Sequence, residues 1–169
     1  MKYIVTGSAG FIGYHLCLKL LENKKNKVLG IDNMNNYYSV KVKKFRNSKL
    51  NKHKNYLFLK KDLTHSNQIE KIFKKFKPNV VINLAAQAGV RYSIENPEVY
   101  IDSNVSGFLN ILECCRHFNI KRLVYGSSSS VYGNSSNIPF SELSSVDKPV
   151  SLYAATKKTN ELMAYTYSN

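Results

Sequence analysis

The chain has 169 residues, 43% of them hydrophobic, which is enough to bury the core of one ordinary domain. It contains no run of about 18 apolar residues and opens on a strand pattern rather than a signal peptide, so we expect a cytoplasmic protein without a membrane segment. The net charge is +14, but nearly all basic residues are lysines spread over predicted helix faces and loops, which favours a solvated surface over a nucleic-acid site.

The first predicted element is a strand at residues 2–6, and it leads directly into three glycines. Gly7, Gly10 and Gly13 have the spacing G-x-x-G-x-x-G. In such a turn the first glycine allows a tight bend, the second lets the backbone approach a pyrophosphate, and the third lets the next helix pack closely. Free N–H groups at the start of that helix would hold phosphate oxygens.

The helix after the glycines is indicated by Ile12, Leu16 and Leu20 at helical spacing, and a second apolar strand at residues 27–31 ends at Asp32. A carboxylate about 20 residues beyond such glycines can accept hydrogen bonds from an adenosine ribose, and it would repel a 2′-phosphate. Strand, glycine turn, helix, strand and acid therefore predict a dinucleotide site for NAD rather than NADP.

Strand and helix patterns alternate through the rest of the chain, after a polar connection rich in Tyr and Lys. The connection covers residues 33–55, strands are predicted at 56–59, 79–84 and 122–125, and helices at 68–76 and 97–117. Asn96 is a plausible N-cap, with Pro97 at the first helical position. The alternation predicts an α/β fold over residues 1–169: a doubly wound parallel sheet with helices on both faces, that is, a Rossmann fold.

The three cysteines, Cys17, Cys114 and Cys115, have no metal-ligand spacing. Cys114 and Cys115 fall on a helical pattern, where a reduced thiol behaves as a small hydrophobe. We expect neither a disulfide nor a metal site.

Four consecutive serines follow the last predicted strand, between Gly126 and Gly133. Serine runs commonly form flexible linkers. Open α/β sheets, however, bind ligands at the carboxyl ends of their strands. The run is therefore either a linker or a source of hydroxyl groups for a site.

Tyr153 and Lys157 lie four residues apart at a predicted helix start, which places both side chains on one face. A phenol with a pKa near ~10 is a poor base at neutral pH, but a neighbouring ammonium group favours the phenolate. Tyr153 is therefore a candidate proton acceptor and donor, and a solvated surface pair is the alternative interpretation.

Two longer strings accompany these motifs: NLAAQAGVRYS at residues 83–93 and VSLYAATKK at residues 150–158. With them, nearly the whole chain resembles the extended short-chain dehydrogenase/reductase family, and within it the NAD-dependent epimerases and dehydratases. The strings are most similar to those of UDP-glucuronate 4-epimerases.

The resemblance implies that Tyr153 is the catalytic base, that Lys157 binds the nicotinamide ribose, and that Ser128 contacts the sugar 4-hydroxyl. Ser129 and Ser130 can share the role of Ser128, and Arg91 is a candidate anion contact, with a loop salt bridge as the alternative. Besides Tyr153 and Lys157, the implied NAD contacts are Gly7, Gly10, Phe11, Ile12, Gly13, Asp32, Asn33, Asp62, Leu63, Leu84, Ala85, Ala86, Gln87 and Asn104.

The implied reaction converts UDP-glucuronate to UDP-galacturonate through a transient 4-keto sugar, with bound NAD carrying the redox step. Another UDP-sugar is an alternative substrate. Sugar 4,6-dehydratases resemble these enzymes but carry an Asp-Glu pair where this chain has Ser128–Ser130. A noncatalytic NAD-binding protein would typically lack the Tyr/Lys pair, and a nucleic-acid-binding module is a further alternative.

Members of this family continue past the Tyr/Lys helix into further strands and a smaller substrate domain, whereas this sequence ends at Asn169. We therefore expect the chain to correspond to the N-terminal half of an epimerase, without the C-terminal strands and substrate domain. Turnover by the chain alone would then be impaired. Full-length relatives suggest a homodimer, formed through helices at residues 97–117 and 153–167.

Overall fold

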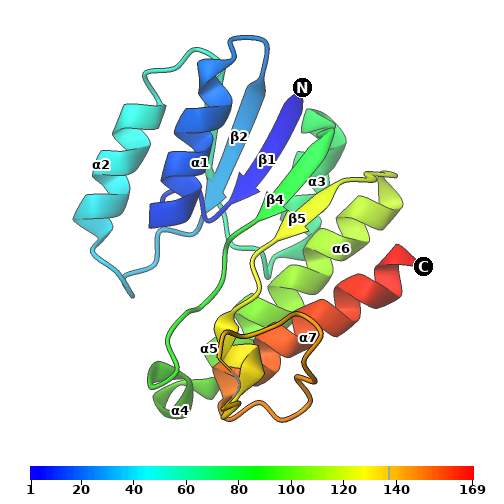
Figure 1. Cartoon of the computed structure of the whole chain (residues 1–169). Helices are drawn as coiled ribbons and strands as arrows, with labels where there is room; N and C mark the ends of the chain where they lie inside the picture. The colour runs from blue at the N-terminus through cyan, green and yellow to red at the C-terminus, as the bar shows by residue number, and fades with distance from the viewer. Residues whose placement is uncertain (137) are drawn as a thin grey trace.

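Figure 1 shows the computed structural model, which describes residues 1–136 and 138–169. At its centre lies a parallel sheet of five strands in the order β3-β2-β1-β4-β5. The strands are β1 (Lys2–Thr6), β2 (Lys27–Asp32), β3 (Tyr56–Lys60), β4 (Val80–Asn83) and β5 (Leu123–Tyr125). The predicted doubly wound sheet is confirmed, and all five strands were placed correctly from their apolar runs.

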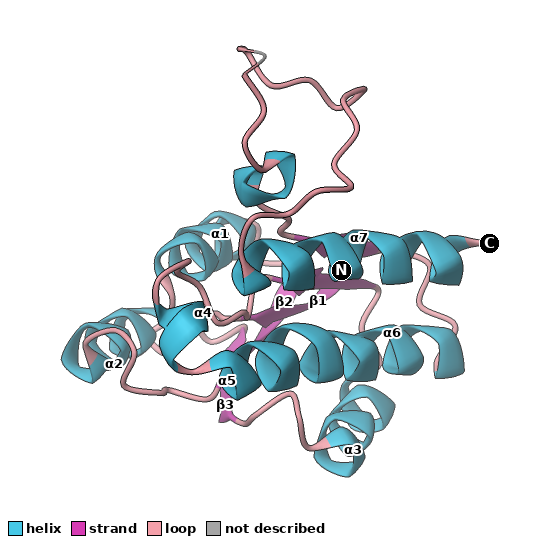
Figure 2. Cartoon of the chain, turned by 90° about the horizontal axis from the view of Figure 1, so that it is seen from below, coloured by secondary structure: helices cyan, strands magenta, loops and turns pink. Residues whose placement is uncertain are grey.

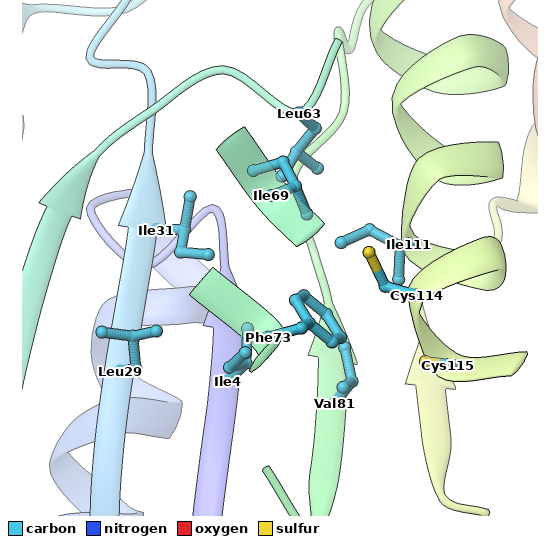
Figure 3. Packing of buried hydrophobic residues seen from close by; sticks show 10 residues of the cluster. All are labelled: Ile4, Leu29, Ile31, Leu63, Ile69, Phe73, Val81, Ile111, Cys114 and Cys115. Atoms are coloured by element: carbon cyan, nitrogen blue, oxygen red, sulfur yellow. The ribbon is translucent and has the colours of Figure 1, made fainter. Parts of the chain in front are cut away.

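Helices cover both faces of the sheet, because alternate strand residues point to opposite sides. On one face lie α1 (Phe11–Glu22) and α2 (Val40–Leu50), and on the other lie α3 (Ser66–Phe76) and α6 (Gly107–His117). The first face buries side chains such as Val5, Val28 and Ile82 against α1 and α2. The second buries Ile4, Leu29 and Val81 against α3 and α6, as Figure 3 shows.

The predicted helix at 97–117 is present but is not uniform. It comprises α5 (Pro97–Tyr100), a π-helical segment η1 (Ile101–Ser106) and α6. Asn96 occupies the N-cap position and Pro97 begins the helix, as predicted, although the Asn96 side chain makes no capping hydrogen bond. A short additional helix, α4 (Tyr92–Glu95), was not predicted.

The Tyr/Lys segment begins the last helix, α7 (Leu152–Ser168). The Ser151 hydroxyl caps it by accepting the Ala154 amide at 3.1 Å. Helix α7 lies beside α6 and η1 (Figure 2). The serine run forms a 3₁₀ turn, η2 (Ser129–Tyr132), which packs against α7. It is therefore a structured part of the domain, not the linker that its composition also allowed.

The predicted polar connection at 33–55 was wrong, because α2 forms in its middle. Only Lys43 and Leu50 of this helix are buried. The segment therefore has no apolar stripe of the kind that reveals a helix in a sequence. Contacts with α1 stabilise the helix in the folded chain instead.

The three thiols are free and buried, and burial raises the pKa of each to about 12. They therefore stay protonated and pack as small apolar groups. Among the helices of the described residues, none is both long enough and apolar enough to cross a membrane.

Candidate active site

A cavity of about 650 Å³ opens at the carboxyl edge of the sheet. Residues that directly follow each of the five strands line it, as expected for a ligand site in an open α/β sheet. Every residue for which the sequence predicted an NAD contact is among the lining residues, except Asn104. The topology thus brings together segments that lie far apart in the sequence.

The glycine turn forms the wall of the cavity beside β1. Gly7 has a φ of +67°, and a Cβ atom there would stand 2.8 Å from the Ala85 amide nitrogen. A Cβ atom on Gly13 would collide with the carbonyl oxygen of Gly7, so only glycine lets α1 approach this closely. The amides of Phe11 and Ile12, in the first turn of α1, have no acceptor within the helix and can bind an anion.

Asp32 ends β2 and is buried. Its carboxylate accepts the amides of Ala9 at 3.1 Å and Met34 at 2.8 Å. The Lys43 ammonium group stands 3.9 Å away and donates to both the carbonyl and the side-chain oxygen of Asn35. The carboxylate is therefore fixed between the glycine turn and α2, facing the cavity.

Asp62 follows β3 at the same end of the cavity. Burial opposes its ionisation, but hydrogen bonds from Asn33 and Thr64 outweigh that effect and lower its pKa below the ordinary value. The Asn33 amide group donates at 2.8 Å, and the Thr64 amide and hydroxyl donate at 3.0 and 2.8 Å. This carboxylate is thus ionised and held by neutral donors.

The chain after β4 is bent around the Thr6 hydroxyl. That oxygen accepts the amides of Leu84 and Ala85 at 3.2 and 3.1 Å and donates to Asn83 at 2.6 Å. The bend carries Ala85, Ala86 and Gln87 along the cavity wall. Two strands thereby cooperate in setting the position of this wall.

Tyr153 and Lys157 also line the cavity, from one face of α7. Lys157 is only 5% exposed, and burial lowers its pKa to about 8, although the nearby Glu161 partly offsets this. The ring of Tyr153 meets the ring of Tyr100 edge-on, with centroids 6.1 Å apart. The pair is therefore an inward-facing arrangement and not the solvated surface pair that the spacing also allowed.

Comparison with known proteins identifies the family. Residues 4–169 match the model of the family described as GDP-mannose 4,6 dehydratase. The chain belongs to this family. The match confirms the resemblance to NAD-dependent epimerases and dehydratases that the sequence strings indicated.

Sequence matches to individual relatives agree with the family match. The chain is 56% identical to Protein CapI of Staphylococcus aureus, over all of this chain and 50% of that protein. It is 48% identical to the UDP-glucuronate 4-epimerase of Thermodesulfobacterium geofontis, over 98% of this chain and 50% of the relative. The chain thus spans about half the length of the curated relatives it matches.

A solved structure agrees with these sequence matches. The UDP-glucuronic acid 4-epimerase of Bacillus cereus, in complex with UDP-glucuronic acid and NAD, superposes with a TM-score of 0.90 and 33% identity. The superposition covers 99% of this chain and 52% of the Bacillus chain.

The residues predicted to contact the substrate do not line the cavity; they are Arg91, Ser128, Ser129 and Ser130. Ser128 caps η2, where its hydroxyl oxygen accepts the Ser130 amide at 3.2 Å. Its neighbour Ser127 does line the cavity and donates to Glu161 at 2.5 Å. Arg91 is exposed at the start of α4.

Sequence reasoning missed the part of the site that is formed by α2 and by the segment directly before it. The lining residues from this segment are Asn35, Tyr37, Tyr38, Ser39, Val42, Lys43 and Arg46. The available signal was a pair of basic residues, Lys43 and Arg46, three positions apart shortly after Asp32. In a segment this rich in lysine, that signal does not stand out. Within the described part of the chain, no group of three His, Cys, Asp or Glu side chains could hold a metal ion.

Proposed function

We propose that the protein is an NAD-dependent nucleotide-sugar 4-epimerase that interconverts UDP-glucuronate and UDP-galacturonate. The observation that carries this proposal is that Tyr153 and Lys157 share one cavity with the glycine turn and Asp32. The UDP-glucuronate 4-epimerases among the relatives and the Bacillus cereus complex support it.

The residues of the cavity fit NAD. The crowded turn at Gly7 and Gly13 has no room for side chains, which leaves backbone amides free to face a pyrophosphate. The Asp32 carboxylate can accept hydrogen bonds from ribose hydroxyls and would repel a 2′-phosphate. When bound, NAD would supply the acceptor and donor of a hydride.

Tyr153 would take the proton from the sugar 4-hydroxyl and later return it. Because its pKa is about 8, Lys157 is largely cationic at neutral pH, and from the same helix face as Tyr153 it would bind the nicotinamide ribose. We assign Ser128 to a hydrogen bond with the 4-hydroxyl, with Ser129 or Ser130 sharing that role. Arg91 would contact an anionic part of the substrate.

The family description raises a second candidate, sugar 4,6-dehydration. Eliminating water across C5 and C6 needs an additional acid and base. Ser128, Ser129 and Ser130 offer only hydroxyl groups where dehydratases carry carboxylates. Glu161, which binds Ser127, is not among the residues that line the cavity. This composition favours epimerisation.

We also propose that the full-length protein pairs as a homodimer through α5–α6 and α7. Val99, Ile101 and Leu109 expose apolar side chains on the first of these helices, and Leu162 and Tyr165 do so on α7. Such exposed apolar residues are typical of surfaces that pair with another chain.

The experiment that tests the function is incubation of the purified protein with NAD and UDP-glucuronate, beside a Tyr153→Phe variant. Products are separated by anion exchange and weighed by mass spectrometry. A product of unchanged mass that co-elutes with UDP-galacturonate, formed only by the unsubstituted protein, is expected. The phenol-to-phenyl change should lower turnover by at least about 100-fold, because it removes the proton-transfer group.

Other products would contradict the proposal. A product lighter by one water molecule would identify a dehydratase instead. If Tyr153→Phe turned over as fast as the unsubstituted protein, Tyr153 would not be the base. If the chain alone is inactive, the same assay is repeated with the C-terminal half of a close relative supplied as a second polypeptide.

A further inference from the structure

The helix that packs behind Gln87, on the cavity wall that follows β4, departs from regular α-helical geometry. Between α5 and α6, the segment η1 is π-helical over Ile101–Ser106. Such segments are rare and occur frequently at functional sites. Here a buried side chain of another helix binds a backbone carbonyl of the segment.

That side chain is Asn160 of α7. Its amide group donates to the backbone carbonyl of Asn104 at 2.6 Å, and the two residues are 3% and 1% exposed. In a regular α-helix this carbonyl would accept the amide four residues on, that of Phe108. A buried donor from α7 competes with that amide for the same carbonyl, which disfavours the regular α-helical hydrogen bond at this point.

Asn104 lies within the π-helical turn, and its side chain is fully hydrogen-bonded. Its carboxamide accepts the Gln87 amide at 2.7 Å and donates to the Gln87 carbonyl at 3.0 Å. Its second N–H donates to the Thr156 hydroxyl at 3.0 Å, and that hydroxyl donates to the Tyr153 carbonyl at 2.8 Å. Asn104 therefore lies behind the cavity and clamps the wall that Gln87 belongs to.

We propose that Asn160 is a positioning residue: by holding the Asn104 carbonyl it maintains the π-helical turn, which aims the Asn104 side chain at Gln87. One buried network thus couples the helix that carries Tyr153 and Lys157 to the wall formed after β4. The inference rests on the proposed function in one respect, namely that this wall contacts NAD.

The test compares Asn160→Leu with Ile111→Val. Leucine is close to asparagine in shape but donates no hydrogen bond. Ile111 is buried in α6, and its shortening loosens the same helix without touching the network. Two quantities are measured for each protein: the dissociation constant for NAD by equilibrium dialysis, and the hydrogen-exchange rate of the Gln87 amide by NMR.

In Asn160→Leu we expect the NAD dissociation constant and the Gln87 exchange rate each to rise roughly tenfold, a change that corresponds to about 1.4 kcal/mol. Ile111→Val should change each of these two quantities by less than about twofold. In a double-mutant cycle, adding Asn160→Leu to Asn104→Ala should weaken NAD binding little further, because Asn160 acts through Asn104.

The two measurements distinguish a failure of this inference from a failure of the proposed function. If the unsubstituted protein does not bind NAD, the proposed function fails, while the exchange rate of the Gln87 amide still decides the inference. An exchange rate in Asn160→Leu that matches Ile111→Val would overturn the inference. So would a double mutant whose losses simply add.

Discussion

Lys157 shows how a buried cation at the candidate site can lower the stability of the protein that carries it. The side chain is almost entirely removed from water, and burial lowers its pKa from 10.5 to about 8. Between these values the unfolded chain binds more protons than the folded chain, so the free energy of unfolding rises with pH. Below about pH 8 the folded protein bears the full desolvation penalty of the ammonium group.

Lys157→Met should therefore stabilise the protein at neutral pH. The expected gain is up to about 3 kcal/mol, the equivalent of the pKa shift, and it should disappear as the pH approaches about 10. Urea unfolding at the two pH values measures it. Lys71→Met is the control, because it makes the same change in helix propensity at an exposed position of α3. A pH-independent difference would contradict the assigned cause.

At the scale of elements, α2 is anchored by a buried cation as well as by its contacts with α1. Lys43 lies beside Asp32 and donates two hydrogen bonds to Asn35, so it ties the helix to the loop that follows β2. The position of the Asp32 carboxylate in the cavity wall therefore depends on a helix that the sequence pattern did not reveal.

Lys43→Met should destabilise the fold by about 2 kcal/mol, because it leaves the Asp32 carboxylate buried without its cation. It should also weaken NAD binding. Lys44→Met changes the exposed neighbour on the same helix, and its effect should stay within about 0.5 kcal/mol. Chemical unfolding and equilibrium dialysis with NAD measure the two effects. Equal behaviour of the two variants would show that the Lys43 contacts do not anchor α2.

At the scale of the whole molecule, the sheet is covered unevenly. Strand β5 lies at one edge, and its residue Val124 is 57% exposed. Val124 is the register partner of Ile82 on β4. Ile82 belongs to the hydrophobic cluster that α1 covers, whereas Val124 does not. An unpaired edge with an apolar face favours association with another strand.

The 169-residue protein should therefore associate as its concentration rises, and Val124→Lys should shift it toward the monomer. Light scattering coupled to size exclusion gives the mass at each concentration. Leu57→Lys is the matched control, because Leu57 is 53% exposed on the opposite edge strand. A monomer at every concentration, or an equal effect of the two substitutions, would argue against association through β5.

The sequence by itself determined the sheet, because buried parallel strands are continuous apolar runs that need no tertiary information to recognise. It also determined the glycine turn, Asp32 and the Tyr153/Lys157 pair, since each is a local pattern with its own chemistry. Only the tertiary structure decided which polar side chains are buried in and around the cavity. Lys43, Asn104 and Asn160 are polar residues whose roles come from burial and from partners 8 to 56 residues away. No local pattern encodes such partners, because folding alone brings them together.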